Sequence, residues 1–209
     1  MLDIGKKWNM KKIRNLLIIM SGILTVFYII NHNGNLTLSK YLVIISLYPV
    51  YFVPSTLKIL FKFDLDEKLE FSYVLFIFVA QFLGSVIGFY GKFYYYDKIT
   101  HFISGILTSF IALDLLDKYK IKNKKFTFLF MIIFSVFVAA FWEFFEYTSD
   151  LLLHGDVQKV LKTGVRDTMQ DMLCAFFSST ICSILYYFSR KNVKNNWFYS
   201  FSFKKMLYL

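Results

Sequence analysis

The chain alternates between long apolar segments and short polar segments that carry most of its lysines. A helix needs about 20 apolar residues to cross the roughly 30 Å hydrocarbon core of a bilayer. By that criterion we expect membrane-spanning helices over residues 13–30, 38–60, 69–90, 99–116, 126–153 and 167–188. The pattern predicts an all-α polytopic membrane helix bundle, with six transmembrane helices in a single integral membrane domain over residues 1–209.

Composition agrees with this pattern and excludes an ordinary soluble domain. Hydrophobic residues make up 57% of the chain, and its mean hydropathy is +0.51, which is high for a globular protein. The formal charge of +10 would suit a nucleic-acid partner, but the basic residues lie in short stretches between apolar segments. We therefore expect membrane lipids as partners and no nucleic acid.

The distribution of lysine and arginine predicts how the helices are oriented. Most of these residues lie at the two ends of the chain and in segments 58–68 and 118–125, which six helices place on one side. The opposite side holds Lys40, Lys92, Lys98, Lys159, Lys162 and Arg166. Because positively charged segments tend to stay in the cytoplasm, we expect both termini there and the protein in the bacterial cytoplasmic (inner) membrane.

Two further patterns concern helix shape and helix packing. Pro49 and Pro54 predict a kink in the second helix, because proline lacks the amide hydrogen that continues a helix. Ala80, Gly84 and Gly88 follow one another at intervals of four residues. This spacing predicts a face of small residues on which the third helix packs against its neighbours.

Acidic residues and one histidine occur in or at the ends of the last three apolar segments. The pairs at helical spacing are Asp97-x-x-x-His101, Glu143-x-x-Glu146 and Asp167-x-x-x-Asp171. In the orientation given above, all of them lie near the extracytoplasmic face. Charges within a membrane are costly, so we expect these helix faces to turn inward and to form a functional site.

An alternative is that these groups are solvated at helix ends and paired with nearby cations. The candidate cations for such pairing are Lys92, Lys98, Lys162 and Arg166. Glu143 and Glu146 fit this alternative least, because they lie among Phe, Trp and Ala residues, where an unpaired charge is unfavourable.

One histidine among several carboxylates is a set of hard ligands, which suits a divalent cation such as Mg²⁺ or Mn²⁺. The candidate metal ligands are Asp97, His101, Glu143, Glu146, Asp167 and Asp171. The candidates for acid–base catalysis and for stabilising a phosphate or an oxyanion are Glu143, Glu146, His101 and Arg166. Proton sharing among close carboxylates explains the same residues without a metal, so the cofactor stays open.

Three motifs follow one another in the second half of the chain. They are Tyr96-Asp97-x-x-x-His101-Phe102, Trp142-Glu143-x-x-Glu146 and Asp167-x-x-x-Asp171-Met172. This order resembles the YjdF-like bacterial integral membrane proteins, a family whose function is largely unknown. The resemblance covers about residues 94–180 and leaves the first three helices without a counterpart. It implies a polar site at these positions but no particular reaction.

The same segment is similar, more weakly, to the VanZ-like membrane proteins, whose founding member is associated with teicoplanin resistance. Their pattern is Asp-Lys-x-x-His, then Glu-x-x-Gln, then an Arg followed by Asp and Asn. The matching residues are Asp97-Lys98-x-x-His101, Glu143, and Arg166 with Asp171. Glu146 stands in place of the Gln and Ala175 in place of the Asn, which weakens this second resemblance.

Together these observations predict an inner-membrane protein with an outward-facing carboxylate and histidine site. The depth of the site, at the level of lipid headgroups, favours metal-assisted chemistry on a lipid or cell-envelope precursor. Two other functions are consistent with the same residues: a small cation- or proton-coupled transporter, and a non-catalytic envelope or antibiotic-resistance factor. The sequence leaves open whether the protein is an enzyme, and it leaves the oligomeric state open as well.

Overall fold

The computed structural model describes residues 9–32 and 35–188, and these residues form helices and connecting segments without a strand. Their contacts divide the chain into two compact units, Met1–Ile87 and Gly88–Leu209. The expectation of a single membrane domain over residues 1–209 stays a prediction.

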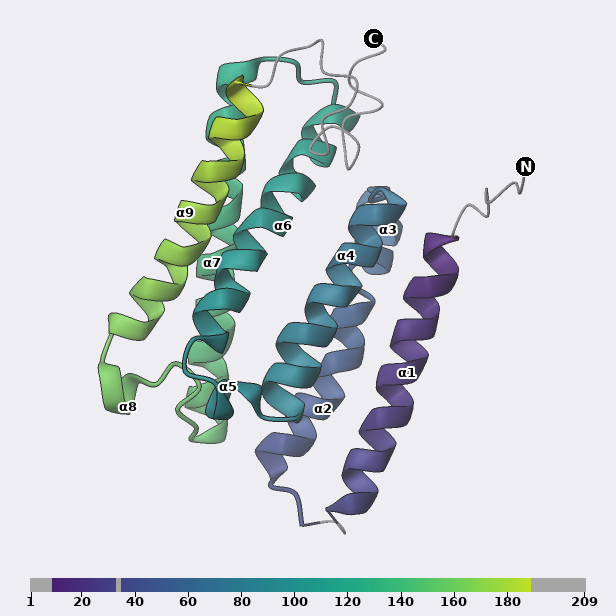
Figure 1. Ribbon diagram of the computed structural model, residues 1–209, viewed down its shortest axis with the longest axis vertical. Coiled ribbons are helices and arrows are strands. Elements are labelled where there is room, and N and C mark those ends of the chain that lie inside the picture. Colours follow the sequence, from purple (N-terminus) through teal and green to yellow (C-terminus); the bar gives the residue numbers. More distant parts are fainter. Residues whose placement is uncertain (1–8, 33–34, 189–209) are drawn as a thin grey trace, which may run out of the picture. The chain divides into compact units, whose positions relative to one another are not determined.

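The described residues of the first unit form five helical elements (Figure 1). They are α1 (Met10–Asn31), α2 (Leu38–Tyr51), α3 (Val53–Phe61), α4 (Glu67–Ile77) and the π-helix η1 (Phe78–Val86). Side chains of Asn9, Thr37 and Asp66 accept hydrogen bonds from backbone amides of the first turns of α1, α2 and α4. These caps satisfy amides that have no partner within the helix, which explains where the three helices begin.

The second predicted span is bent, as the two prolines indicated. Helices α2 and α3 meet at an angle of 47° around Phe52. Pro54 lies in the first turn of α3, where its missing amide hydrogen costs no helical bond, and Pro49 lies inside α2. The prediction of a proline kink in this span is confirmed.

The third predicted span is shorter than expected at its C-terminal end. Helix α4 continues into η1, which ends at Val86, and Gly88 has a φ of 88°. Ala80 and Gly84 are buried, as expected of a packing face. The prediction that Gly88 belongs to that face was wrong, because Gly88 lies beyond the helix. It supplies the left-handed conformation that ends the span.

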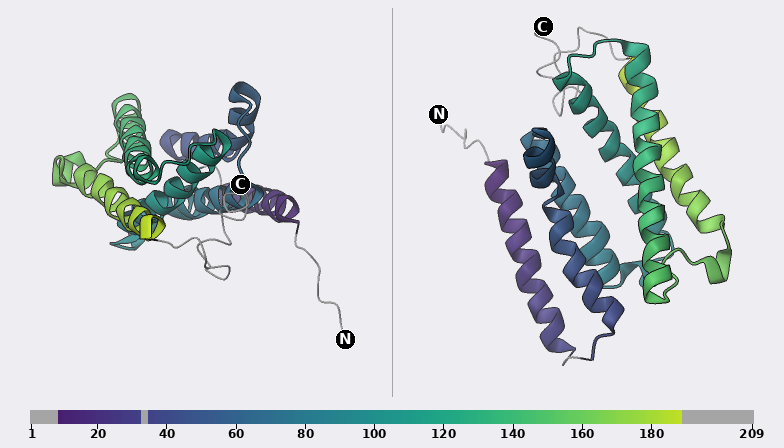
Figure 2. Two further views of the ribbon diagram at one scale, coloured as in Figure 1. Left: turned by 90° about the horizontal axis from the view of Figure 1, so that it is seen from above. Right: turned by 180° about the vertical axis from the view of Figure 1, so that it is seen from behind.

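Up to residue 188, where the described part of the chain ends, the second unit forms three long helices and two short ones. They are α5 (Phe89–Lys92), α6 (Tyr96–Lys118), α7 (Lys124–Leu153), α8 (Val160–Thr163) and α9 (Arg166–Phe188). Helices α6, α7 and α9 pack against one another in every pairing (Figure 2). A side chain at Gly105 of α6 would lie 2.6 Å from the carbonyl oxygen of Ala175 in α9, so these two helices meet almost backbone to backbone.

Buried hydroxyl groups fill the centre of this three-helix contact. Thr108 Oγ1 donates to Ser135 Oγ at 2.8 Å, and Ser109 Oγ donates to the Gly105 carbonyl oxygen at 2.7 Å. Small polar residues of this kind are typical of helix–helix contacts in membranes. They let the backbones approach closely, and their hydroxyl groups find hydrogen-bond partners within the contact.

The described helices agree with a membrane-spanning bundle. Five of them are long and apolar enough to cross a bilayer: α1, α4 with η1, α6, α7 and α9. The bent pair α2 and α3 raises the number to six if it forms one span. An all-α polytopic bundle is therefore confirmed, and the predicted orientation of the termini stays a prediction.

Candidate functional site

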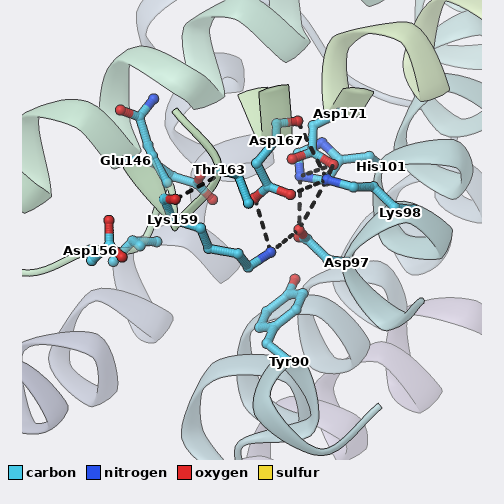
Figure 3. Close-up of polar contacts among 12 residues, drawn as sticks. Tyr90, Asp97, Lys98, His101, Glu146, Asp156, Lys159, Thr163, Asp167 and Asp171 are labelled. Carbon is cyan, nitrogen blue, oxygen red and sulfur yellow. Dashed lines mark hydrogen bonds and ion pairs between the residues drawn. The ribbon is translucent and has the colours of Figure 1, made fainter. Parts of the chain in front are cut away.

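The polar residues singled out in the sequence come together at one end of the second unit (Figure 3). Helices α6 and α9 begin at this end and α7 ends there, because the chain crosses the unit in alternating directions. Asp97 lies in the first turn of α6 and Asp167 in the first turn of α9. A carboxylate near a helix N-terminus is stabilised by the positive end of the helix dipole.

At this end an ionic cluster forms from two helices and one connecting segment. Its members are Asp97, Lys98, His101, Lys159, Asp167 and Asp171. Lys98 is central: its Nζ lies 2.6 Å from Asp167 Oδ1, 2.7 Å from Asp171 Oδ1 and 3.5 Å from Asp97 Oδ2. The sequence suggested Lys98 as a pairing partner of carboxylates, and this pairing is confirmed.

Lys159 is a member of the cluster that the sequence did not reveal. It belongs to the segment between α7 and α9, and its Nζ lies 2.5 Å from Asp97 Oδ2 and 3.0 Å from Asp167 Oδ2. Burial alone lowers the pKa of Lys159, but these two hydrogen bonds outweigh burial, so its pKa is raised and the side chain stays charged. Its backbone is left-handed, with a φ of 56°, which is uncommon for a residue with a side chain.

The cations of the cluster lie nearer to its surface than the carboxylates do. The side chains of Lys159 and Lys98 are 36% and 23% exposed, whereas those of Asp97, Asp167 and Asp171 are 14%, 11% and 3% exposed. A molecule that approaches from outside therefore meets the ammonium groups first.

Three members of the cluster have potential metal-ligand atoms close to one another. Asp97, His101 and Asp171 each offer one ligand atom, and these atoms all lie within 4.8 Å of one another. His101 Nε2 is 3.6 Å from Asp97 Oδ1 and 3.8 Å from Asp171 Oδ1. Ligand atoms around one octahedral Mg²⁺ lie roughly 3 Å apart, so a small closure of the three side chains would fit this ion.

Not every predicted ligand joins this arrangement. Asp167 is held by both lysines, and Glu143 and Glu146 lie outside the group of three. Lys98 bonds to Asp171, so a cation bound there would have to displace its ammonium group. Metal binding by any of these residues stays a prediction.

Glu143 is the most deeply buried glutamate of the region, with 4% of its surface exposed. Gln158 Nε2 lies 3.3 Å from Glu143 Oε2 and 3.1 Å from the Glu143 carbonyl oxygen. Glu143 Oε1 has no hydrogen-bond partner among the described residues, while the negative charges of Asp97 and Asp167 act on this side chain. A buried carboxyl oxygen without a donor is unfavourable, which indicates that it takes up a proton or a ligand.

The other two residues proposed for catalysis form no ion pair with the cluster among the described residues. Glu146 Oε1 accepts a hydrogen bond of 2.8 Å from Trp142 Nε1, one turn earlier on α7. Arg166 is exposed at the first residue of α9 and forms no ion pair within the described part of the chain. Their predicted roles stay predictions.

The segment that delivers Lys159 is fixed by Asp150. Asp150 Oδ1 accepts from the Val157 amide at 2.6 Å, and its Oδ2 accepts from the Gln158 amide at 2.9 Å. Asp150 therefore acts as a brace for this turn. These bonds span seven and eight residues, which lies outside regular helical spacing, so the sequence pattern did not mark Gln158 or Lys159 as members of the site.

Tyr90 of α5 adds a hydroxyl group at the edge of the cluster. Its hydroxyl points toward Asp97 (Figure 3) and lies 3.4 Å from Thr100 Oγ1, which donates to the Asp97 carbonyl oxygen at 2.7 Å. Burial raises the pKa of Tyr90 above its usual value, so the hydroxyl keeps its proton and can donate it in a hydrogen bond.

Comparisons with known proteins place the chain in a family without supplying a reaction. An uncharacterized protein of Thermotoga maritima is 25% identical over 172 residues, which cover 78% of this chain and 82% of the relative. No solved structure matches the chain. The YjdF-like and VanZ-like resemblances are not shown by these matches and stay predictions. The family described as predicted membrane protein (DUF2238) matches residues 13–192, and the chain therefore belongs to this family of multi-pass membrane proteins.

Proposed function

We propose that this protein binds one divalent cation, Mg²⁺ or Mn²⁺, in the ionic cluster and uses it on the polar headgroup of a lipid or cell-envelope precursor. In this proposal the protein lies in the bacterial cytoplasmic membrane, and the cluster opens to the extracytoplasmic side. The observation that carries the proposal is the convergence of Asp97, His101 and Asp171, whose ligand atoms lie within 4.8 Å of one another.

The charges of the site support a further cation. Three aspartates of the cluster face two lysines, so one negative charge is left over, and Glu143 and Glu146 add carboxyl groups close by. Several carboxylates so close together cannot all stay ionised without added positive charge, which a cation or protons supply. Two carboxylate oxygens and one imidazole nitrogen form a donor set that accepts Mg²⁺ or Mn²⁺.

In such a site the bound cation would polarise an oxygen of the substrate and offset the charge that develops on it. Glu143 is the candidate general base, because one of its oxygens has no partner among the described residues. Arg166 is exposed beside Asp167 and is the candidate to approach the outer part of an anionic substrate.

A cation- or proton-coupled transporter is the rival proposal. It would need polar groups that lead from the cluster through the unit. The buried hydroxyls of Ser109, Ser178 and Ser183 instead each donate to a carbonyl oxygen of their own helix. Hydroxyls satisfied in this way are typical of helix packing, so they favour the first proposal.

The test is a metal analysis of the purified full-length protein in detergent, after incubation with Mn²⁺ and removal of free metal. We expect about one Mn²⁺ per chain in the wild type, as one site with several hard ligands predicts. Asp171→Asn removes a ligand charge and should lose most of the bound metal. Asp114→Asn is the control, because Asp114 pairs with Lys118 elsewhere on α6 and its loss should leave the metal content unchanged.

A folded wild-type protein that retains no divalent cation would contradict this proposal. The same result would favour proton sharing and, with it, the transporter or the non-catalytic envelope or resistance factor. If metal is found, hydrolysis of lipid-linked phosphates should be compared between wild type and Glu143→Gln, which keeps the size of the side chain but removes the base.

A further inference from the structure

Two ammonium groups in the ionic cluster are held by one shared carboxylate. Asp167 Oδ1 accepts from Lys98 Nζ at 2.6 Å, and Asp167 Oδ2 accepts from Lys159 Nζ at 3.0 Å. Both nitrogens also approach Asp97 Oδ2, at 3.5 Å and 2.5 Å. The two ammonium groups are therefore close enough to bind a single anionic group together.

The surroundings of this lysine pair favour an anion that arrives from outside. The lysine side chains are more exposed than the carboxylates below them. The N-termini of two long helices, α6 and α9, lie at this same end of the unit, and the positive ends of their helix dipoles favour negative charge. Arg166, exposed at the start of α9, adds a further positive charge.

A cation in the group of three would change what the lysines can bind. Lys98 Nζ lies 2.7 Å from Asp171 Oδ1, so a cation at Asp171 would displace this ammonium group. The cation would also take over the neutralisation of Asp97, which Lys159 now provides. Each ammonium group would then keep Asp167 as its partner in the cluster and could accept another anion as well. Mg²⁺ in proteins is commonly bound by one or two carboxylates together with phosphate oxygens of the substrate.

A second observation points to a ligand at the same place. Glu143 is 4% exposed, and its Oε1 has no hydrogen-bond partner among the described residues. This side chain lies close enough to Asp97 and Asp167 for their charges to act on it. A buried acceptor without a donor is expected to meet a hydroxyl group or water that a bound substrate brings.

We propose that the substrate carries a phosphate group, and that Lys98 and Lys159 exchange their contacts with Asp97 and Asp171 for this phosphate when the divalent cation binds. This inference rests on the proposed function, since it requires the cation. It adds the chemical class of the substrate and assigns the two lysines to its recognition. Its consequence is reciprocal coupling: the cation tightens phosphate binding, and phosphate tightens cation binding by the same factor.

The test measures binding of two probes to the full-length protein in a neutral detergent by calorimetry, with and without Mg²⁺. One probe is inorganic phosphate, and the other is short-chain phosphatidic acid. We expect Mg²⁺ to tighten binding of at least one probe by about 5- to 150-fold, the usual range of such coupling. Tighter binding of the lipid alone identifies a lipid phosphate, and tighter binding of inorganic phosphate alone identifies a free phosphate. An equal effect on both assigns recognition to the phosphate group itself.

Matched variants decide whether the lysine pair is responsible for the coupling between cation and phosphate binding. Lys159→Gln should lose the coupling while Mn²⁺ still binds, and Lys159→Arg should keep much of it because the positive charge remains. Lys162→Gln is the control, since Lys162 is an exposed lysine of the same segment. Size-exclusion profiles and helix content show whether each variant is folded.

The outcomes separate this inference from the proposed function. If Mn²⁺ binds but Mg²⁺ changes the affinity of neither probe, the phosphate inference is overturned and the metal site stands. The phosphate inference is also overturned if Lys159→Gln and Lys162→Gln behave alike. If the folded protein binds no divalent cation, the proposed function fails and this inference fails with it.

Discussion

At the scale of single residues, adjacent positions in one short segment contact two different parts of the site. Gln158 turns toward α7 and donates to Glu143, whereas Lys159 reaches the aspartates of α6 and α9. Asp150 holds the backbone of this segment through the amides of Val157 and Gln158. One braced turn thereby supplies both the donor for a buried glutamate and a cation for the ionic cluster.

Gln158→Ala should destabilise the protein. It removes the Gln158 donor to the buried Glu143 carboxyl group, whose Oε1 already has no hydrogen-bond partner among the described residues. Loss of a partner to a buried polar group costs about 1–3 kcal/mol. The measurement is the apparent melting temperature in detergent, which should fall. Gln170→Ala, at an exposed position of α9, should leave it nearly unchanged, and equal effects of the two substitutions would contradict this role.

At the scale of elements, the site depends on how closely α6 approaches α9. A Cβ atom at Gly105 would lie 2.6 Å from the carbonyl oxygen of Ala175 and 2.8 Å from its Cα. Both are backbone atoms, so no side-chain rotation can make room. This approach lies one turn below His101, and it brings the first turns of both helices within reach of the same lysines.

Gly105→Ala should push α6 and α9 apart and lower the melting temperature. Overpacking of this kind costs about 1–3 kcal/mol, and it should also weaken Mn²⁺ binding because Asp97 and His101 move relative to Asp171. Gly91→Ala in α5 is the matched control, since a Cβ atom there would meet nothing within 4 Å. That substitution should leave the melting temperature unchanged or slightly raised. A Gly105→Ala protein as stable as the wild type would exclude the close approach.

At the scale of the whole molecule, the side of the membrane to which the ionic cluster opens determines which substrates it can meet. Helix α7 has 30 residues and is about 45 Å long, enough to cross a bilayer with an end to spare. Lys122 precedes α7 and Leu161 follows it, and both are exposed. The two positions therefore report opposite faces of the membrane, and the lysine distribution predicts that Leu161 lies outside.

Labelling of intact cells tests this orientation. In a variant whose Cys174 and Cys182 are replaced by serine and alanine, a single cysteine is introduced as Leu161→Cys or Lys122→Cys. A membrane-impermeant maleimide should label the first and should label the second only after the cells are opened. The reverse pattern would place the ionic cluster on the cytoplasmic side and would exclude an extracytoplasmic substrate.

The helices and most members of the ionic cluster were predictable from the sequence. The predicted spans agree with the helices within a few residues, because the length of an apolar segment and the thickness of a bilayer are both fixed before any tertiary contact forms. Asp97, His101, Asp167 and Asp171 were recognisable because ionisable groups in or beside apolar spans are costly and therefore stand out in the sequence. The spacing of small residues placed Gly88 within the third helix, but its left-handed backbone lies beyond the end of that helix.

The tertiary structure alone decided which of these groups meet. Asp97, His101 and Asp171 form a group of three, while Glu143 turns to Gln158 and Asp150 braces a turn. Lys159 joins the cluster from a left-handed turn. Hydropathy and helical spacing describe positions along one helix, whereas these pairings depend on the distance between helices and on the path of the segment that connects them. That distance is set by packing at residues such as Gly105, whose partners lie far away in the sequence.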